Sequence, residues 1–201
     1  MQCGTCHSSG VPLNIGTVQC KTTGHFEENF SLDKKAEEAF VVKGACEPEV
    51  LKKLLCDNSQ RWTQIFVPEV LCIPTHKPDV EQLITVNAAV QLLSQRVVKT
   101  PNSCGLKNEE GTKLTGKKLI IEGILRQKIM YTADVPEQSV HTVHFDVPFS
   151  AFIVLNECDS LTEKFSIDIC IEDIYVTSIT PRQIFKNVTL FIKAKRLCRE
   201  E

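Results

Sequence analysis

Stretches rich in Val, Ile, Phe and Thr recur between residues 40 and 196, separated by Pro, Gly, Asn and Asp. Along residues 165–172, Phe and Ile alternate strictly with polar or small residues, the period of two that gives a strand one apolar face. Seven such stretches predict strands at residues 40–46, 63–73, 83–98, 118–131, 140–155, 165–179 and 184–196. The pattern predicts an all-β fold, an antiparallel β-sandwich or jelly-roll-like domain.

Two segments do not follow this pattern. Residues 49–56 (EVLKKLLC) fit a short amphipathic helix or a strand equally well. Residues 26–39 are rich in charge and fit a short helix or a solvated linker.

The first 24 residues contain few apolar side chains and read as an N-terminal arm. Val11, Leu13 and Ile15 alternate with polar or small neighbours, and Val18 follows, so this segment can dock as an extended strand. We therefore expect an arm and linker over residues 1–38 and a β domain over residues 39–201.

Two dipeptides recur at one constant spacing in the β region. Val67-Pro68 is matched by Val147-Pro148, and Thr100-Pro101 by Thr180-Pro181. The repetition indicates half-units at 40–101 and 117–198, although such dipeptides are common at strand ends and coincidence is the alternative.

Composition and motifs argue against several classes of function. The 201 residues carry a net charge of −2 with acids and bases intermixed, which argues against a nucleic-acid or anionic-membrane surface. The apolar runs are too short to span a bilayer. Phosphate-binding, dinucleotide-binding, nucleophile-elbow and zinc-protease motifs are missing, so we do not expect an enzyme.

Cysteine usage is the unusual feature: there are ten, and Cys3, Cys6 and Cys20 lie in the arm. No secretory signal precedes them, so we expect synthesis in a reducing compartment. With His25, these three cysteines form a C-x2-C and C-x4-H set that can hold zinc. The Cys3–His7 segment also fits haem attachment, and its C-x-x-C fits a redox dithiol, but both contexts are poor.

The remaining interpretation of the arm is cross-linking, which needs no cofactor. Thiols on an accessible arm reach neighbouring molecules more readily than thiols inside a sheet. Candidate acceptors are Cys170 on a polar strand face, Cys104 and Cys158 in predicted loops, and Cys198 near the C-terminus. Cys46 and Cys72 read as small core residues, and the pattern does not place Cys56.

Three segments together resemble a known family: residues 67–83, residues 118–150 and residues 171–188, which include VPEVLCIP, VHTVHFDVPFS and IEDIYV. In their residues and in their order along the chain, these segments are similar to the SPOCS domain of spore-coat morphogenetic and other spore-surface proteins of endospore-forming anaerobes. The resemblance spans about residues 40–196 and leaves the arm out.

The resemblance implies a β-rich structural module made in the mother cell and deposited on the forming spore. Its thiols would oxidise once the spore is exposed, without a signal peptide. We therefore expect a homo-oligomeric, head-to-tail subunit of a coat, exosporium or appendage fibre, cross-linked by disulfides from the arm. The alternative is a coat adaptor that recruits another spore-coat protein, with zinc in the arm.

Overall fold

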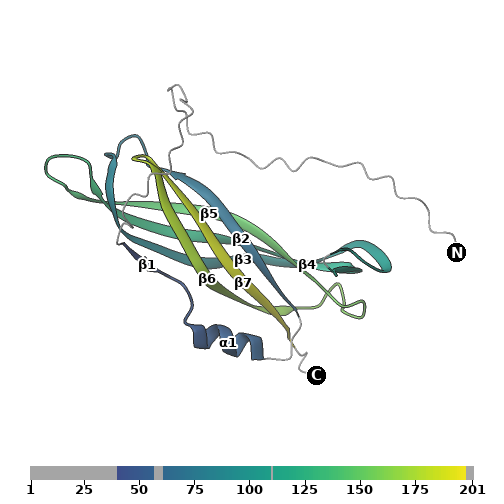
Figure 1. Cartoon of the computed structure of the whole chain (residues 1–201). Helices are drawn as coiled ribbons and strands as arrows, with labels where there is room; N and C mark the ends of the chain where they lie inside the picture. Colours follow the sequence, from purple (N-terminus) through teal and green to yellow (C-terminus); the bar gives the residue numbers. More distant parts are fainter. Residues whose placement is uncertain (1–39, 57–60, 110, 198–201) are drawn as a thin grey trace. The chain divides into compact units, whose positions relative to one another are not determined.

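The computed structural model describes residues 40–56, 61–109 and 111–197. The predicted arm, with its apolar segment, His25 and Cys3, Cys6 and Cys20, lies outside these residues, as does Cys198. The all-β prediction is confirmed: the described chain folds into two sheets with one short helix (Figure 1). Each of the seven stretches predicted as strands overlaps one observed strand, and the strands at 80–107 and 113–133 are longer than predicted.

Sheet A has the order β1-β3-β4-β5. Its strands are β1 (Val41–Lys43), β3 (Val80–Lys107), β4 (Lys113–Ala133) and β5 (Val140–Val154). All pairs are antiparallel except β1, which runs parallel to β3 over three residues. The β3–β4 pair contains register shifts at several points along its length, so this long hairpin is irregular.

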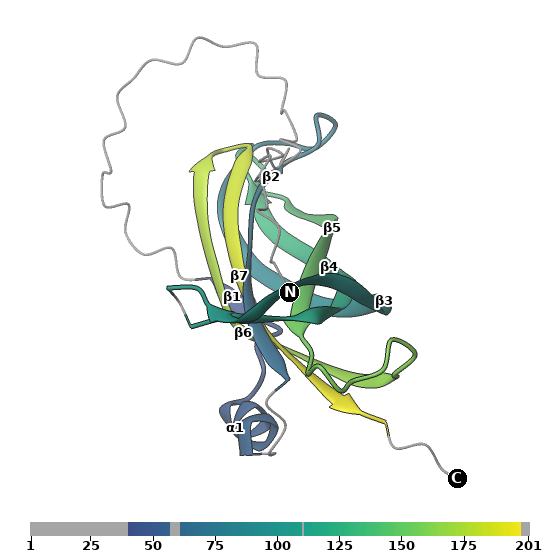
Figure 2. The ribbon, with the colours of Figure 1, turned by 90° about the vertical axis from the view of Figure 1, so that its right-hand side faces the viewer.

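Sheet B has the order β2-β7-β6 and is antiparallel. Its strands are β2 (Trp62–Cys72), β6 (Phe165–Thr180) and β7 (Gln183–Arg196). Figure 2 shows the sheets as two layers, with β6 and β7 on one side and β4 and β5 on the other. Each sheet contains strands from both halves of the chain. The half-units predicted from the repeated dipeptides stay a prediction.

The core lies between the two sheets and comes from the alternate positions that the sequence pattern selects. Along β4, every second residue from Leu119 to Ala133 is buried, and β7 buries Ile184, Val188 and Leu190 opposite them. These side chains belong to one continuous apolar cluster. Truncating one of them to alanine typically costs about 2–5 kcal/mol of stability.

Residues 40–56, here called the strap, join the edges of the two sheets. The strap begins as β1 on the edge of β3 and turns away at Gly44. The backbone N–H of Cys46 then donates a hydrogen bond to the carbonyl oxygen of Ile171 in β6, at 2.8 Å. After this contact the strap continues into a helix.

The helix, α1 (Pro48–Cys56), resolves the ambiguity of the EVLKKLLC segment. Pro48 suits the first helical position, where its missing N–H is not needed, and Glu49 and Lys53 carry charges that favour the helix termini. At the other end, Leu54 accepts a hydrogen bond through its carbonyl oxygen from the ammonium of Lys193. This contact and the nearby Trp62 leave Lys193 almost fully buried on the outer face of β7.

The loops define two ends of the sandwich. At the head end, the guanidinium of Arg182 in the β6–β7 turn donates to the carbonyl oxygens of Ile73, Pro74 and Lys77 in the β2–β3 loop. The tail end carries the β3–β4 hairpin, the β5–β6 loop and the last residues of β7. Because Val41 pairs with Thr85 and β1 runs parallel to β3, the first residue of β1 lies nearer the head end than its last.

We predict that Gly44→Ala loosens the strap. Gly44 has φ = +116°, and an added Cβ would lie 1.9 Å from the carbonyl oxygen of Ala88. Strain and collision together should cost about 1–3 kcal/mol, which raises hydrogen exchange at the amides of 41–46 while β4 stays protected. Gly111→Ala is the control, because φ is +83° there but no atom lies within 4 Å. Equal exchange in both variants would contradict the role of the close approach.

Candidate functional site: cysteines and a sheet edge

The free cysteines in the described part of the chain are Cys56, Cys104 and Cys158, and all three are exposed. Cys56 ends α1 beside the last residues of β7, Cys104 lies in the β3–β4 hairpin, and Cys158 lies in the β5–β6 loop. The structure therefore places every one of these thiols at the tail end. The exposure expected of Cys104 and Cys158 is confirmed, while their pairing with the arm stays a prediction.

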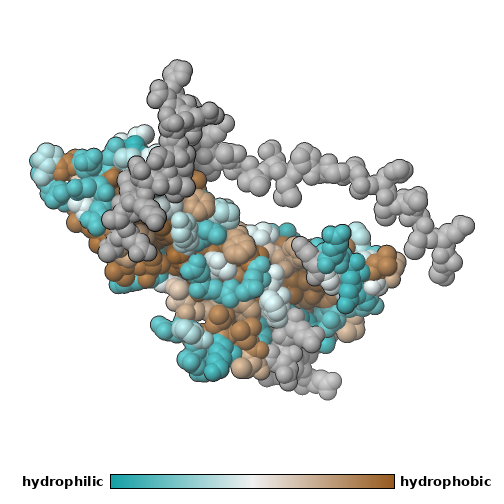
Figure 3. All heavy atoms as spheres, in the orientation of Figure 1, coloured by the Kyte–Doolittle hydropathy of each residue, from teal (hydrophilic) through white to brown (hydrophobic). Residues whose placement is uncertain are grey.

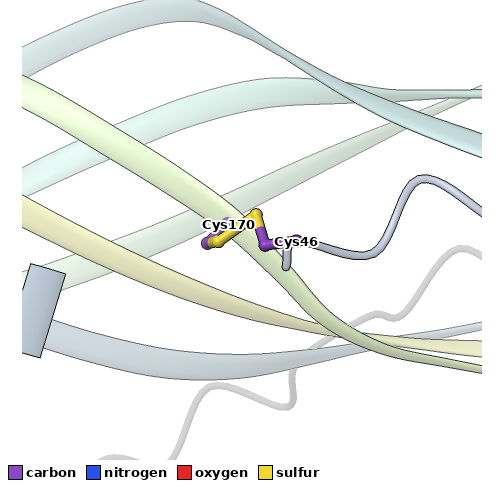
Figure 4. Close-up of a disulfide and its surroundings, with 2 residues drawn as sticks. All are labelled: Cys46 and Cys170. Carbon is purple, nitrogen blue, oxygen red and sulfur yellow. A yellow bond between two sulfur atoms is a disulfide. The ribbon is translucent and has the colours of Figure 1, made fainter. Parts of the chain in front are cut away.

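The prediction that Cys170 is an exposed acceptor was wrong. Cys170 is 1% exposed and forms a disulfide with Cys46 of the same chain (Figure 4). Strand alternation did identify its face correctly, since Ile171 next to it points into the core. What the alternation missed is the strap, which crosses that outer face and covers the sulfur.

The expectation that Cys46 and Cys72 are ordinary core residues was wrong as well. Both are only partly buried, and both are disulfide-bonded. Cys46 and Cys170 are 124 residues apart in sequence, so the bond between the strap and β6 closes a loop that contains most of the domain's residues. A cross-link that closes so long a loop restricts the unfolded chain strongly.

The loop that carries Cys158 is fixed by ion pairs. The carboxylate of the adjacent Asp159 is fully buried and accepts from the Arg61 guanidinium at 2.8 Å and from the Asn156 backbone N–H at 2.9 Å. At the other end of the loop, Glu163 pairs with Arg196 at 2.8 Å and holds the pKa of that guanidinium above its ordinary value. Cys158 is thus an exposed thiol on an anchored backbone.

Cys104 sits in a tight turn of the β3–β4 hairpin. Its φ is +52°, and its backbone N–H donates to the side-chain oxygen of Asn102 at 2.7 Å. Gly105 follows with φ = +86°, and the next residue, Leu106, is 75% exposed. The turn presents a thiol and an apolar side chain together to solvent.

Beside this hairpin, the described strands pair with only a short part of one edge of β3. Among the described strands, only β1 pairs with that side of β3, and it covers Thr85–Asn87. Beyond Ala88 the edge continues towards the tail end and exposes Leu92 and Leu93. An uncovered edge offers a row of backbone N–H and C=O groups to an additional strand.

Apolar side chains also reach the surface elsewhere. Figure 3 shows them as brown patches among polar residues. On the outer face of sheet B, Phe66, Val70 and Tyr175 are 70%, 45% and 55% exposed. Exposed apolar patches of this kind mark contact surfaces more often than catalytic ones.

The described residues form no group of three or more His, Cys, Asp or Glu side chains suited to a metal ion. The alternative zinc set, Cys3, Cys6, Cys20 and His25, falls outside these residues. In the described ranges, no helix has the length and apolar character needed to cross a membrane.

The fold defines the class of the described chain, an all-β domain of two sheets in which antiparallel pairs predominate. Residues 79–179, about half the chain, match the family model described as SipL, SPOCS domain. The chain belongs to this SPOCS-domain family, which is spore-associated and structural rather than enzymatic. The matched span runs from β3 to β6 and contains Cys170, whereas Cys46 and the strap lie outside it.

Searches of curated proteins and of solved structures found no significant match to the chain. The family assignment therefore comes from the SPOCS match alone, and it identifies the chain as a spore-associated protein.

We predict that Cys170→Ser lowers the free energy of unfolding by about 2–4 kcal/mol under oxidising conditions, because it releases the strap from β6. Cys46→Ser should have the same effect, and the double variant should cost no more than either single change. Urea unfolding followed by tryptophan fluorescence measures these differences. Cys104→Ser is the matched control and should leave stability within about 0.5 kcal/mol. Additive losses in the double variant would show that the two sulfurs do not act as a pair.

Proposed function

We propose that this protein is a structural subunit that assembles head to tail on the spore surface, in a coat layer or an appendage fibre. The N-terminal arm of one subunit lies along the next subunit and is locked there by disulfides. The observation that carries the proposal is the polarity of the domain. The strap has its N-terminal end, at β1, towards the head end, whereas the thiols that are exposed in the described residues lie at the tail end.

This polarity favours an open array over a closed pair. A donor at one end and acceptors at the other make a heterologous contact, which repeats from subunit to subunit unless the rotation closes a ring. Thiols clustered on one face at a two-fold axis would instead favour a dimer. The arrangement thus supports a polymer, with Cys3, Cys6 and Cys20 as donors.

The arm is long enough for this role. The 39 residues before Phe40 can span at most about 130 Å when extended. The longest regular strand of the neighbouring core, β4 with 21 residues, is about 70 Å long. An arm can therefore reach the tail-end thiols of the next subunit even when part of it is not extended.

The open edge of β3 is the docking site that we propose for the arm. Val11, Leu13 and Ile15 alternate as one face of a strand requires, and Val18 extends the apolar segment. Pairing along the edge beyond Ala88 would lead the arm towards Cys104 in the hairpin. Cys104 and Cys158 are then the acceptors, with Cys198 as a further candidate from the C-terminus.

The second candidate function is a spore-coat adaptor that recruits another coat protein while its arm binds zinc. The arm sequence favours it through the four ligands Cys3, Cys6, Cys20 and His25. The two functions make opposite demands on the same sulfurs. Zinc needs them as thiolates within one chain, and cross-linking needs them oxidised between chains.

We predict that the full-length chain, oxidised at high concentration, gives a ladder on a non-reducing gel that collapses with dithiothreitol. Replacing Cys3, Cys6 and Cys20 together with serine should remove the ladder, because the donors are lost. Replacing Cys104 and Cys158 together should reduce it at least tenfold, because the acceptors are lost. Disulfide mapping by mass spectrometry then identifies the bonded pairs.

The Cys46→Ser/Cys170→Ser double variant is the control. It removes a disulfide of the body but keeps the arm and the exposed thiols, so its ladder should persist. A monomer that holds one zinc ion per chain and stays monomeric after oxidation would support the adaptor instead. Arm cysteines paired only within their own chain would also overturn the proposal.

A further inference from the structure

Three polar side chains meet between the two sheets, in the middle of the apolar core. Lys186 comes from β7, Glu69 from β2 and Gln127 from β4. Lys186 and Glu69 are direct partners across sheet B, and Gln127 faces them from sheet A. Lys186 is 0% exposed and Gln127 is 3% exposed, so water does not solvate their functional groups.

One oxygen atom holds both nitrogens of this cluster. Glu69 Oε1 lies 3.0 Å from Lys186 Nζ and accepts a hydrogen bond from Gln127 Nε2 at 2.5 Å. The amine of a lysine and the amide of a glutamine are thus brought together around a single carboxylate. Holding two reacting groups side by side makes the reaction between them effectively unimolecular, which lowers its entropic barrier.

The cluster is poorly satisfied as an ion pair. Within the described part of the chain, Glu69 Oε2, Gln127 Oε1 and Lys186 Nζ are buried without a hydrogen-bond partner, the contact of Nζ with Glu69 being ionic. Buried polar atoms nearly always have partners, and two oxygens without any partner beside this ion pair call for an explanation. A cluster kept only for stability would be better replaced by apolar side chains.

Burial acts against the charged form of Lys186. Burial lowers the pKa of the Lys186 ammonium below its usual value, and the nearby Glu69 carboxylate only partly opposes this shift. Transfer of a proton from Lys186 to Glu69 leaves a neutral amine and a neutral carboxylic acid. A desolvated neutral lysine is a competent nucleophile.

We propose that Lys186 and Gln127 form an isopeptide bond that joins sheet B to sheet A, with Glu69 as the proton shuttle. Lys186 Nζ attacks the side-chain carbonyl carbon of Gln127, and the new C–N bond forms as the carbonyl π bond opens. Glu69 delivers the proton to Nε2, the atom with which it is already hydrogen-bonded. The old C–N bond then breaks, and one ammonia leaves for one amide formed.

No oxidant, metal or cofactor takes part in this step, because an amine and a primary amide exchange into a secondary amide and ammonia. The product removes the buried ammonium charge and converts Lys186 Nζ into an amide nitrogen with a single N–H. That N–H can donate to Glu69. The bond ties β4 to β7, the strands that contribute many of the most deeply buried side chains. It acts within one subunit and is independent of the arm.

The test is peptide mapping of the full-length folded protein after reduction and alkylation. Cleavage after glutamate places Gln127 in the peptide 123–137 and Lys186 in the peptide 173–200. We expect these two peptides to be joined, with a combined mass lower by one ammonia and a junction that survives dithiothreitol. Mapping is required because loss of ammonia from Gln2 or an asparagine would change the intact mass equally.

Glu69→Gln keeps the shape of the shuttle but removes its acid, so the rate of joining should fall by about 100-fold or more. Gln138→Ala is the matched control, because Gln138 also donates to a glutamate, Glu81, but at the surface. Its peptides should be joined as in the unsubstituted protein. Separate 123–137 and 173–200 peptides from the folded unsubstituted protein would overturn the proposal, whatever the variants show.

Discussion

Leu125 and Ile129 on β4 and Val188 and Leu190 on β7 are completely buried where the inner faces of the two sheets meet. Every other feature depends on this contact, because it fixes which residues of each strand are available to the outside. Once the inner positions are committed to the core, the remaining positions must face solvent, the strap or another molecule. The placement of the cysteines follows from this division.

The strap changes the outside of sheet B from an exposed surface into a partly covered one. It contains no fully buried residue itself, yet Cys170, Phe191 and Lys193 beneath it are almost completely buried. Its attachment rests on a few specific contacts: the pairing of β1, the Cys46 backbone hydrogen bond, the disulfide and the contact between Lys193 and Leu54. These contacts also set the direction of the strap itself across the domain.

In the described residues of this SPOCS domain, the exposed thiols lie at one end and the strap has its N-terminal end towards the other, so the domain has a built-in direction. Such a direction is what a subunit of a linear or layered assembly needs. An internal bond between the sheets would serve the same purpose in a different way. It would make each subunit resistant to unfolding, as the proposed disulfides from the arm would make the assembly resistant to dissociation. The two kinds of bond use different chemistry and different residues.

Alternation of apolar residues was sufficient to predict the strands and the all-β class, because the period of two is a local property of the chain. It also identified the outward face of Cys170, while the loops predicted between the strands identified the exposure of Cys104 and Cys158. The helix at Pro48–Cys56 was left open, since eight residues of mixed pattern do not discriminate helix from strand.

The pairing of Cys46 with Cys170 and the meeting of Lys186, Glu69 and Gln127 were decided only by the tertiary structure. Each joins residues from strands or segments that are far apart in sequence, and no local period records which faces will be opposed or covered. The sequence by itself determined which side of each strand is apolar. The tertiary structure decided which segments pack against the apolar face of each strand and which cover its polar face. The physical reason is that packing selects one partner for each face out of the many that the pattern allows.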